Sequence, residues 1–542
     1  MRFDRRTLPS LLVAVCCGAI SPRALAEDAP TATTPAIIPL PASMEMDAGR
    51  FHPGKTLHVA ITGKLADRRA IATLANEVLR DAWHRPVATA SAKGRVDLRL
   101  AVAPDAAANP ESYSLRIARD GIVIRAPTST GLFYGLQTLR QIATPGSDAS
   151  AGLPALHIAD QPRFHYRGLM LDSARHMQPI AAIKQQLDLM ARYKFNTFHW
   201  HLTDDQGWRI EIKRFPKLAS ISSMRKETVI GNISNGATAR DGIPYGGYYT
   251  QAQAREIVAY ARARHITVIP EIDMPGHMVA ALAAYPELAC TPGPFEVYTT
   301  WGISDDVLCP SPQTFAFIEG VLDEVMAIFP SHYIHVGGDE APTTRWKQSA
   351  LAQDIIRREG LKDEHALQGW FLRRVEGFVR AHGRTIIGWD EILEGGPSPT
   401  ATVMSWRGMQ GGIEAARLGH DVVMSPTSHA YLDYCQSKAK TEPPCIGSFL
   451  PLRKVYDFEP VPDELTADQA AHILGGQGNL WTEYLKTPQD VQYMLFPRSF
   501  ALAEVLWSPK QSRDWNGFLL RLPAQLAELD RLHVNYRRLD AP

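Results

Sequence analysis

Residues 333–340 read YIHVGGDE, an apolar, strand-like run that ends in two glycines and two adjacent carboxylates. Seven more short runs rich in β-branched and apolar residues lie between residues 168 and 481, three before this stretch and four after it. Amphipathic stretches at helical spacing separate them. They are GLMLDSA from Gly168, NTFHWHL from Asn196, TVIPEID from Thr267, TIIGW from Thr385, TVMSW from Thr402, VVMS from Val422 and GQGNLW from Gly476. Eight strands alternating with helices predict an α/β fold, a closed (β/α)8 or TIM barrel. The alternative, an open doubly wound sheet, would need a glycine-rich phosphate turn after an early strand, which the sequence lacks.

The active site of such a barrel lies at the carboxyl ends of its strands, so the residues that end these runs are the candidates for chemistry. In chain order they are Arg175, Asp204, Asp205, Asp273, His277, Asp339, Glu340, Trp389, Asp390, Trp406, Tyr431, Asp433, Trp481 and Glu483. Such a set suits a sugar, because carboxylic acids can protonate a glycosidic oxygen and aromatic walls can cover a sugar ring. A single tryptophan is more often a core residue, but three that end barrel strands favour a carbohydrate site.

Asp339 and Glu340 are the most informative pair in this set. Adjacent carboxylates repel each other, so the pKa of at least one is expected to rise, as a proton donor near neutral pH requires. A retaining glycosidase with two carboxylates places its acid and its nucleophile roughly 5 Å apart across the sugar, which neighbours in sequence do not suit. We therefore expect Asp339 to hold a substrate group that is itself the nucleophile, while Glu340 moves the proton.

Seven ordered motifs, spread over roughly residues 165–510, resemble the family-20 β-N-acetylhexosaminidases. They are RGLMLDSARH (167–176), FHWHLTDDQGWRIEI (198–212), PEIDMPGH (270–277), HVGGDEAP (335–342), IGWDEIL (387–393), HAYLD (429–433) and GNLWTEYL (478–485). The resemblance implies an exo-acting, retaining glycoside hydrolase that removes terminal N-acetylhexosamine residues, GlcNAc or GalNAc, from the non-reducing end of glycans. It also implies substrate-assisted catalysis through an oxazolinium intermediate.

The resemblance implies a role for each matching residue. Glu340 resembles the general acid and base, Asp339 the acceptor of the acetamide N–H, and Tyr431 the donor to the acetamide oxygen. Asp204 and His277 resemble the pair that tunes Glu340, although Asp205 could replace Asp204 in this role. The residues expected to hold the sugar are the box of Trp389, Trp406 and Trp481, and the hydroxyl partners Arg175, Asp433 and Glu483. No metal or other cofactor is expected.

Two other functions are compatible with parts of the sequence. His199 and His201 lie on one side of a strand, and such a pair can bind metal in a barrel metallohydrolase, with His277 and Asp339 as further ligands. A non-catalytic glycan-binding protein is the other alternative, in which loops 221–249 or 291–310 would block the mouth. The sequence does not fix the natural glycan or the choice between GlcNAc and GalNAc.

The expected domain order begins with a signal peptide at residues 1–26, which has arginines at its start, an apolar run and Ala24-Leu25-Ala26 before the cleavage point. This signal predicts an exported protein, periplasmic or secreted, and leaves the Sec and twin-arginine routes open. A linker (27–35) and a small N-terminal α+β domain (36–162) follow, with strands near 57–61, 96–102 and 122–126 and helices near 65–83 and 130–142. Residues 163–542 form the barrel catalytic domain with a C-terminal helix.

The balance of charge limits the kinds of partner that the sequence predicts. The 57 Lys and Arg balance the 57 Asp and Glu, which argues against a nucleic-acid surface. A glycan or oligosaccharide substrate is the expected partner, without membrane insertion after signal cleavage; a homodimer is an alternative to a monomer.

The cysteines predict disulfide bonds. Cleavage of the signal peptide would remove Cys16 and Cys17. Sequential pairing of Cys290 with Cys309 and Cys435 with Cys445 closes two short loops and is the expected disulfide pattern; free buried thiols are the alternative.

Overall fold

The computed structural model describes residues 34–91, 94–103, 105, 108–143, 152–396 and 398–539. The predicted signal peptide, with Cys16 and Cys17, and residues 27–33 of the predicted linker lie outside the described residues. Within the part of the chain that is described, no helix combines the length and the apolar character needed to cross a bilayer.

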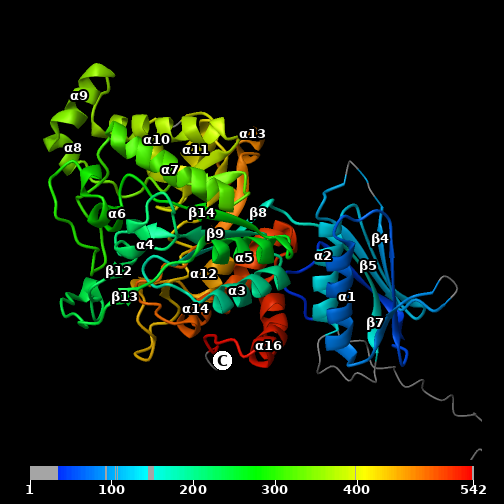
Figure 1. The fold of residues 1–542 in the computed structure, drawn as a ribbon. Helices are drawn as coiled ribbons and strands as arrows, with labels where there is room; N and C mark the ends of the chain where they lie inside the picture. Colours follow the sequence, from blue (N-terminus) through cyan, green and yellow to red (C-terminus); the bar gives the residue numbers. More distant parts are fainter. Residues whose placement is uncertain are drawn as a thin grey trace, which may run out of the picture. The chain divides into compact units, whose positions relative to one another are not determined.

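The N-terminal domain is a mixed sheet with two helices on one face (Figure 1), as the sequence predicted. The strand order is β1-β7-β5-β6-β4-β2-β3. The strands are β1 (Ser43–Phe51), β2 (Leu57–Thr62), β3 (Val87–Thr89), β4 (Leu98–Val102), β5 (Tyr113–Ala118), β6 (Gly121–Ala126) and β7 (Leu153–Asp160), and the helices are α1 (Arg68–Trp83) and α2 (Ser129–Ile142). Strands β1, β3, β5 and β7 were not predicted. β1 is mostly exposed, so it lacks the apolar alternation that identifies a strand.

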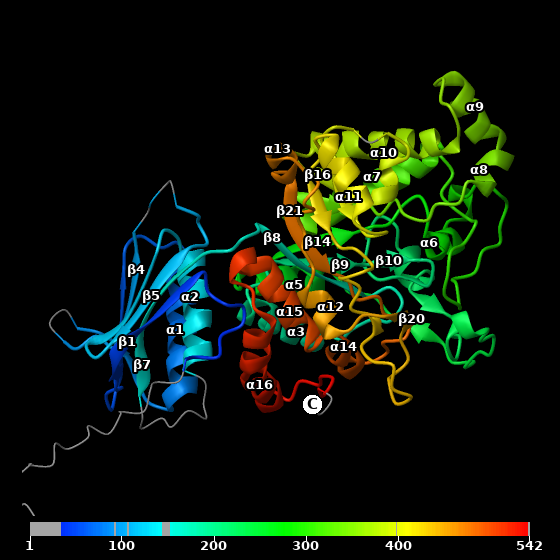
Figure 2. The ribbon, with the colours of Figure 1, turned by 180° about the vertical axis from the view of Figure 1, so that it is seen from behind.

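The domain that begins with β8 contains the predicted eight-stranded parallel barrel, closed in the order β14-β15-β16-β17-β18-β21-β8-β9. Its strands are β8 (Tyr166–Asp172), β9 (Thr197–His201), β14 (Thr267–Glu271), β15 (Tyr333–His335), β16 (Thr385–Trp389), β17 (Thr402–Ser405), β18 (Val422–Met424) and β21 (Ile473–Gly478). Each predicted run overlaps one of them, although β8 and β21 begin two and three residues before the predicted runs at Gly168 and Gly476. Figure 2 shows several of these strands, among them β8, β9, β14 and β21, with helices around them. Every residue of β8 and β9 is buried, because one face meets the surrounding helices and the other fills the lumen.

Helices follow most strands, but one expected helix is missing. Between β16 and β17 the described residues form only the 3-10 turn η3 (Asp390–Leu393) and a loop with Gly395 and Gly396. The longer barrel helices are α3 (Ile180–Arg192), α5 (Gln251–Arg262), α7 (Pro312–Ile328), α10 (Glu364–Ala381), α11 (Gln410–Arg417), α14 (Pro488–Leu495), α15 (Arg498–Trp507) and the C-terminal α16 (Trp515–Arg531). Shorter ones are α4 (Lys217–Ser220), α6 (Val279–Ala284), α8 (Thr344–Gln348), α9 (Ala350–Arg358), α12 (Leu452–Tyr456) and α13 (Ala467–Ala470).

The lumen of the barrel is packed and does not form a channel. Tyr166, Ile269, Ile387, Met404 and Val423 make a buried apolar cluster inside it, and Trp389 packs with them. A ligand must therefore bind above this layer, at the carboxyl ends of the strands.

Both predicted disulfides are present. Cys290 bonds to Cys309, and Cys435 bonds to Cys445. The second bond joins the segment of β19 (Tyr434–Cys435) to the segment before β20 (Ile446–Phe449), two short strands that follow β18. It therefore fixes the long loop between β18 and β21.

Candidate functional site at the mouth of the barrel

The structure gathers most of the predicted residues around one cavity of about 210 Å³. Its lining is Arg175, His277, Asp339, Glu340, Trp389, Trp406, Tyr431, Tyr434, Ile446, Trp481 and Glu483. Five candidates are buried and do not line it: Asp204, Asp205, Asp273, Asp390 and Asp433. Asp204 and Asp433 bear electrostatically on the lining groups Arg175 and Tyr431. No residue of loops 221–249 or 291–310 is among the lining residues, so among the described residues neither loop fills the cavity.

A strained backbone presents the acid pair. Gly337 and Gly338 have φ values of 68° and 94°, and Glu340 has a φ of 45°, in the left-handed region that is costly for residues with a Cβ. Gly337 also has no room for a side chain, because an added Cβ would lie 1.6 Å from Asp273 Oδ1. The glycines thus let the chain turn sharply between β15 and the two carboxylates.

Gly337→Ala is expected to lower the free energy of unfolding by about 3 kcal/mol, since a left-handed Ala and an overpacked Cβ each cost about 1–2 kcal/mol. Urea denaturation measures this. Gly383→Ala is the matched control: its φ is 71°, but nothing lies within 4 Å of the added Cβ, so only the backbone cost applies. Equal losses in the two variants would contradict the crowding at Gly337.

A chain of ionisable groups leads from Asp204 to Glu340. His277 Nδ1 lies 3.2 Å from Asp204 Oδ1 and 3.5 Å from Asp205 Oδ2, and His277 Nε2 lies 3.5 Å from Glu340 Oε2. Asp205 Oδ1 accepts the backbone N–H of Val279, at the start of α6. The structure therefore places Asp204 nearer to His277 and gives Asp205 a part in holding the loop that carries it.

The surrounding charges favour the charged forms of His277 and Asp204. Although burial opposes it, the neighbouring carboxylates, Asp204 first, hold the pKa of His277 well above its ordinary value. Burial would raise the pKa of Asp204, but Arg175 and then His277 hold it below its usual range. An imidazolium thus faces Glu340, whose side chain is 34% exposed in the cavity.

The environment of Asp339 raises its pKa. Burial raises the pKa of Asp339 to about 6; Glu271 and Glu340 add to this, and His277 opposes it. Its Oδ1 atom is buried and has no hydrogen-bond partner among the described residues. Buried polar atoms are normally paired, so this oxygen is available for a donor on a ligand.

The side of the site formed by Arg175, Asp433 and Glu483 is also rich in charge. Arg175 Nη2 lies 2.8 Å from Asp204 Oδ2, and its guanidinium lies over the Trp481 ring. Burial raises the pKa of Glu483 to about 7, although Arg175 opposes this shift. Burial, and after it the charge of Glu483, raises the pKa of Asp433 well above its usual range. Glu483 Oε2 is a second buried oxygen without a partner among the described residues. This side can bind several hydroxyl groups.

Aromatic rings form the walls between these two polar regions. Trp389 and Trp481 lie 5.9 Å apart between ring centroids, and Trp406 stacks with Tyr431 at 6.0 Å. Burial raises the pKa of Tyr431 well above its ordinary value, so its hydroxyl is a neutral donor at physiological pH. The walls can enclose a small planar group such as an amide, as well as one face of a ring.

Sequence reasoning missed three residues at the cavity. Tyr434 and Ile446 line it, and the Cys435–Cys445 bond holds their two segments together. Glu391 Oε2 accepts the indole N–H of Trp406 at 2.9 Å, and burial, then Asp339, raises its pKa to about 8. Glu391 lies in the motif IGWDEIL two residues after Trp389, which was the available signal.

The structure separates the ligands that the metallohydrolase alternative requires. Both ring nitrogens of His201 are bonded, Nδ1 to Glu271 and Nε2 to Asp204. Among the described residues, three groups have ligand atoms close enough for a metal ion, two of them sharing His277, and none combines His199 with His201. They are His199, Glu271 and His335; Asp204, Asp205 and His277; and Asp273, His277 and Asp339. The predicted set of His199, His201, His277 and Asp339 does not occur as one group among the described residues.

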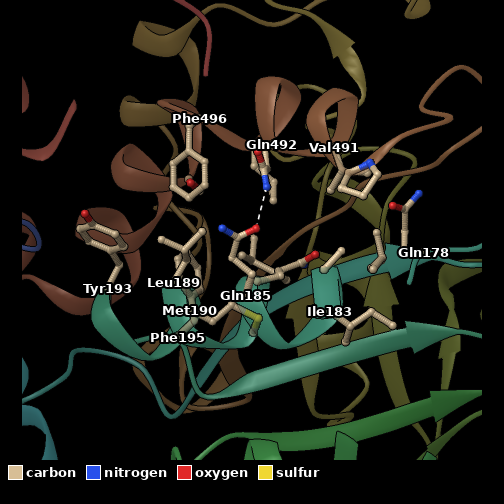
Figure 3. A pocket seen from close by; sticks show the side chains of 17 residues that line it. Gln178, Ile183, Gln185, Leu189, Met190, Tyr193, Phe195, Val491, Gln492 and Phe496 are labelled. Atoms are coloured by element: carbon tan, nitrogen blue, oxygen red, sulfur yellow. Dashed lines mark hydrogen bonds between the residues drawn. The ribbon is translucent and has the colours of Figure 1, made fainter. Parts of the chain in front are cut away.

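A second cavity, of about 20 Å³, lies between α3 and α14, and none of the predicted site residues lines it (Figure 3). Its lining is mostly apolar and includes no charged side chain. Gln492 donates to Gln185 Oε1 at 2.8 Å across it, and Leu189 and Phe496 project toward it. We interpret this cavity as a gap in helix packing.

Comparisons with known proteins agree with this geometry. The model of glycosyl hydrolase family 20, catalytic domain, matches residues 164–510, and that of glycosyl hydrolase family 20, domain 2, matches residues 34–161. Among solved structures, the exo β-N-acetylglucosaminidase of Vibrio harveyi in complex with N-acetylglucosamine is 35% identical, with a TM-score of 0.82 over 96% of this chain and 81% of that one. The N-acetyl-β-hexosaminidase of Streptomyces plicatus is 33% identical, with a TM-score of 0.80 over 94% and 98%.

Curated relatives carry similar names. The β-hexosaminidase of Porphyromonas gingivalis is 47% identical over 434 residues, which are 79% of this chain and 54% of that protein. The β-N-acetylhexosaminidase of Cellulomonas fimi is 32% identical over 92% of this chain and 95% of that protein. The chain thus spans about half the length of the first relative, and it spans 64% of the Vibrio furnissii β-hexosaminidase, but nearly all of the Cellulomonas protein.

Proposed function

Because this chain belongs to glycosyl hydrolase family 20, we propose that it is an exo-acting, retaining β-N-acetylhexosaminidase that uses the substrate acetamide as nucleophile. The observation that carries the proposal is the acid pair at one cavity: Asp339, with an unpartnered buried oxygen, lies beside Glu340 and among Trp389, Trp406 and Tyr431. A carboxylate placed among aromatic walls suits an amide N–H, which needs an acceptor and an apolar enclosure.

The proposed reaction divides the work between the two acids. Asp339 accepts the acetamide N–H and Tyr431 donates to the acetamide oxygen, which attacks the anomeric carbon. The bond to the leaving oxygen breaks as Glu340 gives that oxygen its proton, and an oxazolinium forms. Water then attacks the anomeric carbon, Glu340 takes a proton from it, and the acetamide is restored. Two inversions give net retention.

The contacts of the supporting residues fit this scheme. His277, held by Asp204, faces Glu340 with a positive charge, which favours the carboxylate formed after proton donation. Arg175, Asp433 and Glu483 are proposed to hold the sugar hydroxyls, and Trp481 to cover the ring. Glu483 and Asp433 would decide between GlcNAc and GalNAc through the 4-hydroxyl.

The test is hydrolysis of an aryl N-acetyl-β-glucosaminide. Activity is expected to persist in chelator and to fall steeply as the substrate acetyl group is fluorinated, since fluorine weakens the acetamide nucleophile. Proton NMR of the first product should show retained anomeric configuration. Activity lost to chelator would favour a metallohydrolase, an inverted product would overturn substrate assistance, and sugar binding without turnover would favour a glycan-binding protein.

The pKa of Asp339 predicts the acid side of the pH profile. Its pKa is about 6, and the ionised form is the one that accepts the N–H and offsets the positive oxazolinium. Lowering the pH through 6 protonates it, so kcat/KM should fall roughly tenfold per pH unit below that value. Initial rates between pH 4 and 8 measure this. A flat profile down to pH 4.5 would contradict the proposed role.

Export to the periplasm or the medium is also proposed. The N-terminal arginines, apolar run and Ala24-Leu25-Ala26 sequence support it, as do the two disulfides, which favour an oxidising compartment. Fractionation and N-terminal sequencing of the mature protein should give a start at Glu27; a cytoplasmic protein that retains residues 1–26 would contradict it.

A further inference from the structure

We propose that Glu271 is a positioning residue for the reaction: from beneath the cavity it fixes the indole of Trp389 and, through His201, the carboxylate of Asp204. The inference rests on the proposed function. It assigns a part to the inward-facing polar residues of the barrel that the catalytic scheme leaves unused.

Glu271 is fully buried and has polar partners on both of its oxygens. Oε1 accepts the indole N–H of Trp389 at 2.8 Å and lies 3.0 Å from His335 Nδ1. Oε2 lies 2.5 Å from His201 Nδ1 and 3.0 Å from His199 Nε2. The side chain therefore joins residues from three other strands at one point.

The strand register brings these groups together. Glu271 pairs with His201 on β9 and with His335 on β15, so the three residues lie in one row across adjacent strands. Trp389 ends β16, the next strand after β15. A glutamate that ends a parallel barrel strand thus meets the last residues of the neighbouring strands just below the mouth.

Two routes lead from Glu271 to the cavity. The first is direct, because Trp389 lines the cavity and its indole N–H donates to Glu271. The second passes through His201, whose Nε2 lies 2.8 Å from Asp204 Oδ2, the same oxygen that contacts Arg175 at 2.8 Å. Asp204 also faces His277. Glu271 is therefore linked to a wall of the cavity and to both charged groups held by Asp204.

The charges make these contacts strong. Burial alone would raise the pKa of Glu271, but His335, His201 and His199 hold it well below its usual range. Burial alone would lower the pKa of His201, but Glu271 and Asp204 hold it well above the ordinary value of a histidine. Burial lowers the pKa of His199 to about 4, so His199 is neutral. Hydrogen bonds from a neutral indole and a charged imidazole to a buried carboxylate are shorter and stronger than neutral ones.

Such a network matters because a displacement of about 1 Å in an active site can cost on the order of 10²-fold in rate. Without the carboxylate, the Trp389 ring could tilt and His201 could turn away from Asp204. The wall of the acetamide site and the charged chain to Glu340 would then loosen together.

The experiment is a double-mutant cycle on kcat/KM with the aryl N-acetyl-β-glucosaminide. Glu271→Gln and Trp389→Phe, which removes the indole donor, are each expected to lower kcat/KM on the order of 10²-fold. The double variant should lose little more than the worse single variant, because both remove one interaction. Glu271→Gln should also move the acid limb below pH 6, since it removes a negative charge that raises the pKa of Asp339.

Glu504→Gln is the matched control. Glu504 is also fully buried, but it lies in α15 and binds Tyr456 and Arg521, far from the cavity lining. This variant should lower the melting temperature, leave the acid limb at its wild-type position, and combine additively with Trp389→Phe.

The outcomes separate the two proposals. A wild-type enzyme that does not hydrolyse the substrate overturns the proposed function. An active wild type with additive losses for Glu271→Gln and Trp389→Phe, or an unmoved acid limb, overturns the positioning role alone. If Glu271→Gln does not fold, Trp389→Phe still decides: a loss below about threefold would show that the indole contact has no part in the reaction.

Discussion

Glu340→Gln is expected to lower kcat for phenyl N-acetyl-β-glucosaminide by about 10³-fold, since general acid catalysis contributes roughly 10²–10⁴-fold. Gln keeps the shape of the side chain but has no proton to give. The loss should depend on the leaving group: a dinitrophenolate departs without protonation, so formation of the oxazolinium should be affected much less for that substrate. Steady-state and burst kinetics with both substrates measure the difference.

The control for this variant is Glu394→Gln. Glu394 also follows β16 near the barrel mouth, but it is 43% exposed, binds Arg407 and does not line the cavity. Its replacement should change kcat less than about twofold, as expected for a surface substitution. A loss in Glu340→Gln that is equal for both leaving groups would argue against Glu340 as the acid.

Asp339→Asn is expected to lower kcat/KM by about 10²–10³-fold, the range for removing one group that stabilises developing charge in a buried site. Asn has nearly the same size, and its oxygen can still accept the acetamide N–H, but it cannot offset the positive oxazolinium. The acid limb near pH 6 should disappear in the same variant, because the titrating carboxyl is gone. Rate profiles over pH 4–8 test both points together.

Asp421→Asn serves as the comparison for that experiment. Asp421 directly precedes β18, so it lies at the opposite end of the barrel from the cavity, and its side chain is 48% exposed. Its replacement should preserve both the rate and the acid limb. An acid limb that persists near pH 6 in Asp339→Asn would assign that titration to another group, such as Glu483, whose pKa is about 7.

The cavity walls show how an irregular loop can complete a regular barrel. Tyr434 and Ile446 belong to the excursion between β18 and β21, which the Cys435–Cys445 bond closes. Such loops vary in length without disturbing the strands beneath them. We therefore expect the loop between β18 and β21 to influence which leaving groups the enzyme accepts.

The sequence by itself determined the eight barrel strands and the position of the acid pair. Both are local properties: continuous apolar runs identify strands buried on two faces, and a residue that follows a strand lies at the mouth whatever the rest of the chain does. The same reasoning placed Arg175, His277 and the three tryptophans correctly in the cavity lining.

Only the tertiary structure decided which side chains meet. The preference of His277 for Asp204 over Asp205, the bond from Trp406 to Glu391 and the contacts of Glu271 join residues far apart in the chain. These contacts depend on strand register and barrel closure, which bring polar side chains together without leaving a pattern in the local sequence. The tertiary structure also showed that the described residues between β16 and β17 form a 3-10 turn in place of the expected helix.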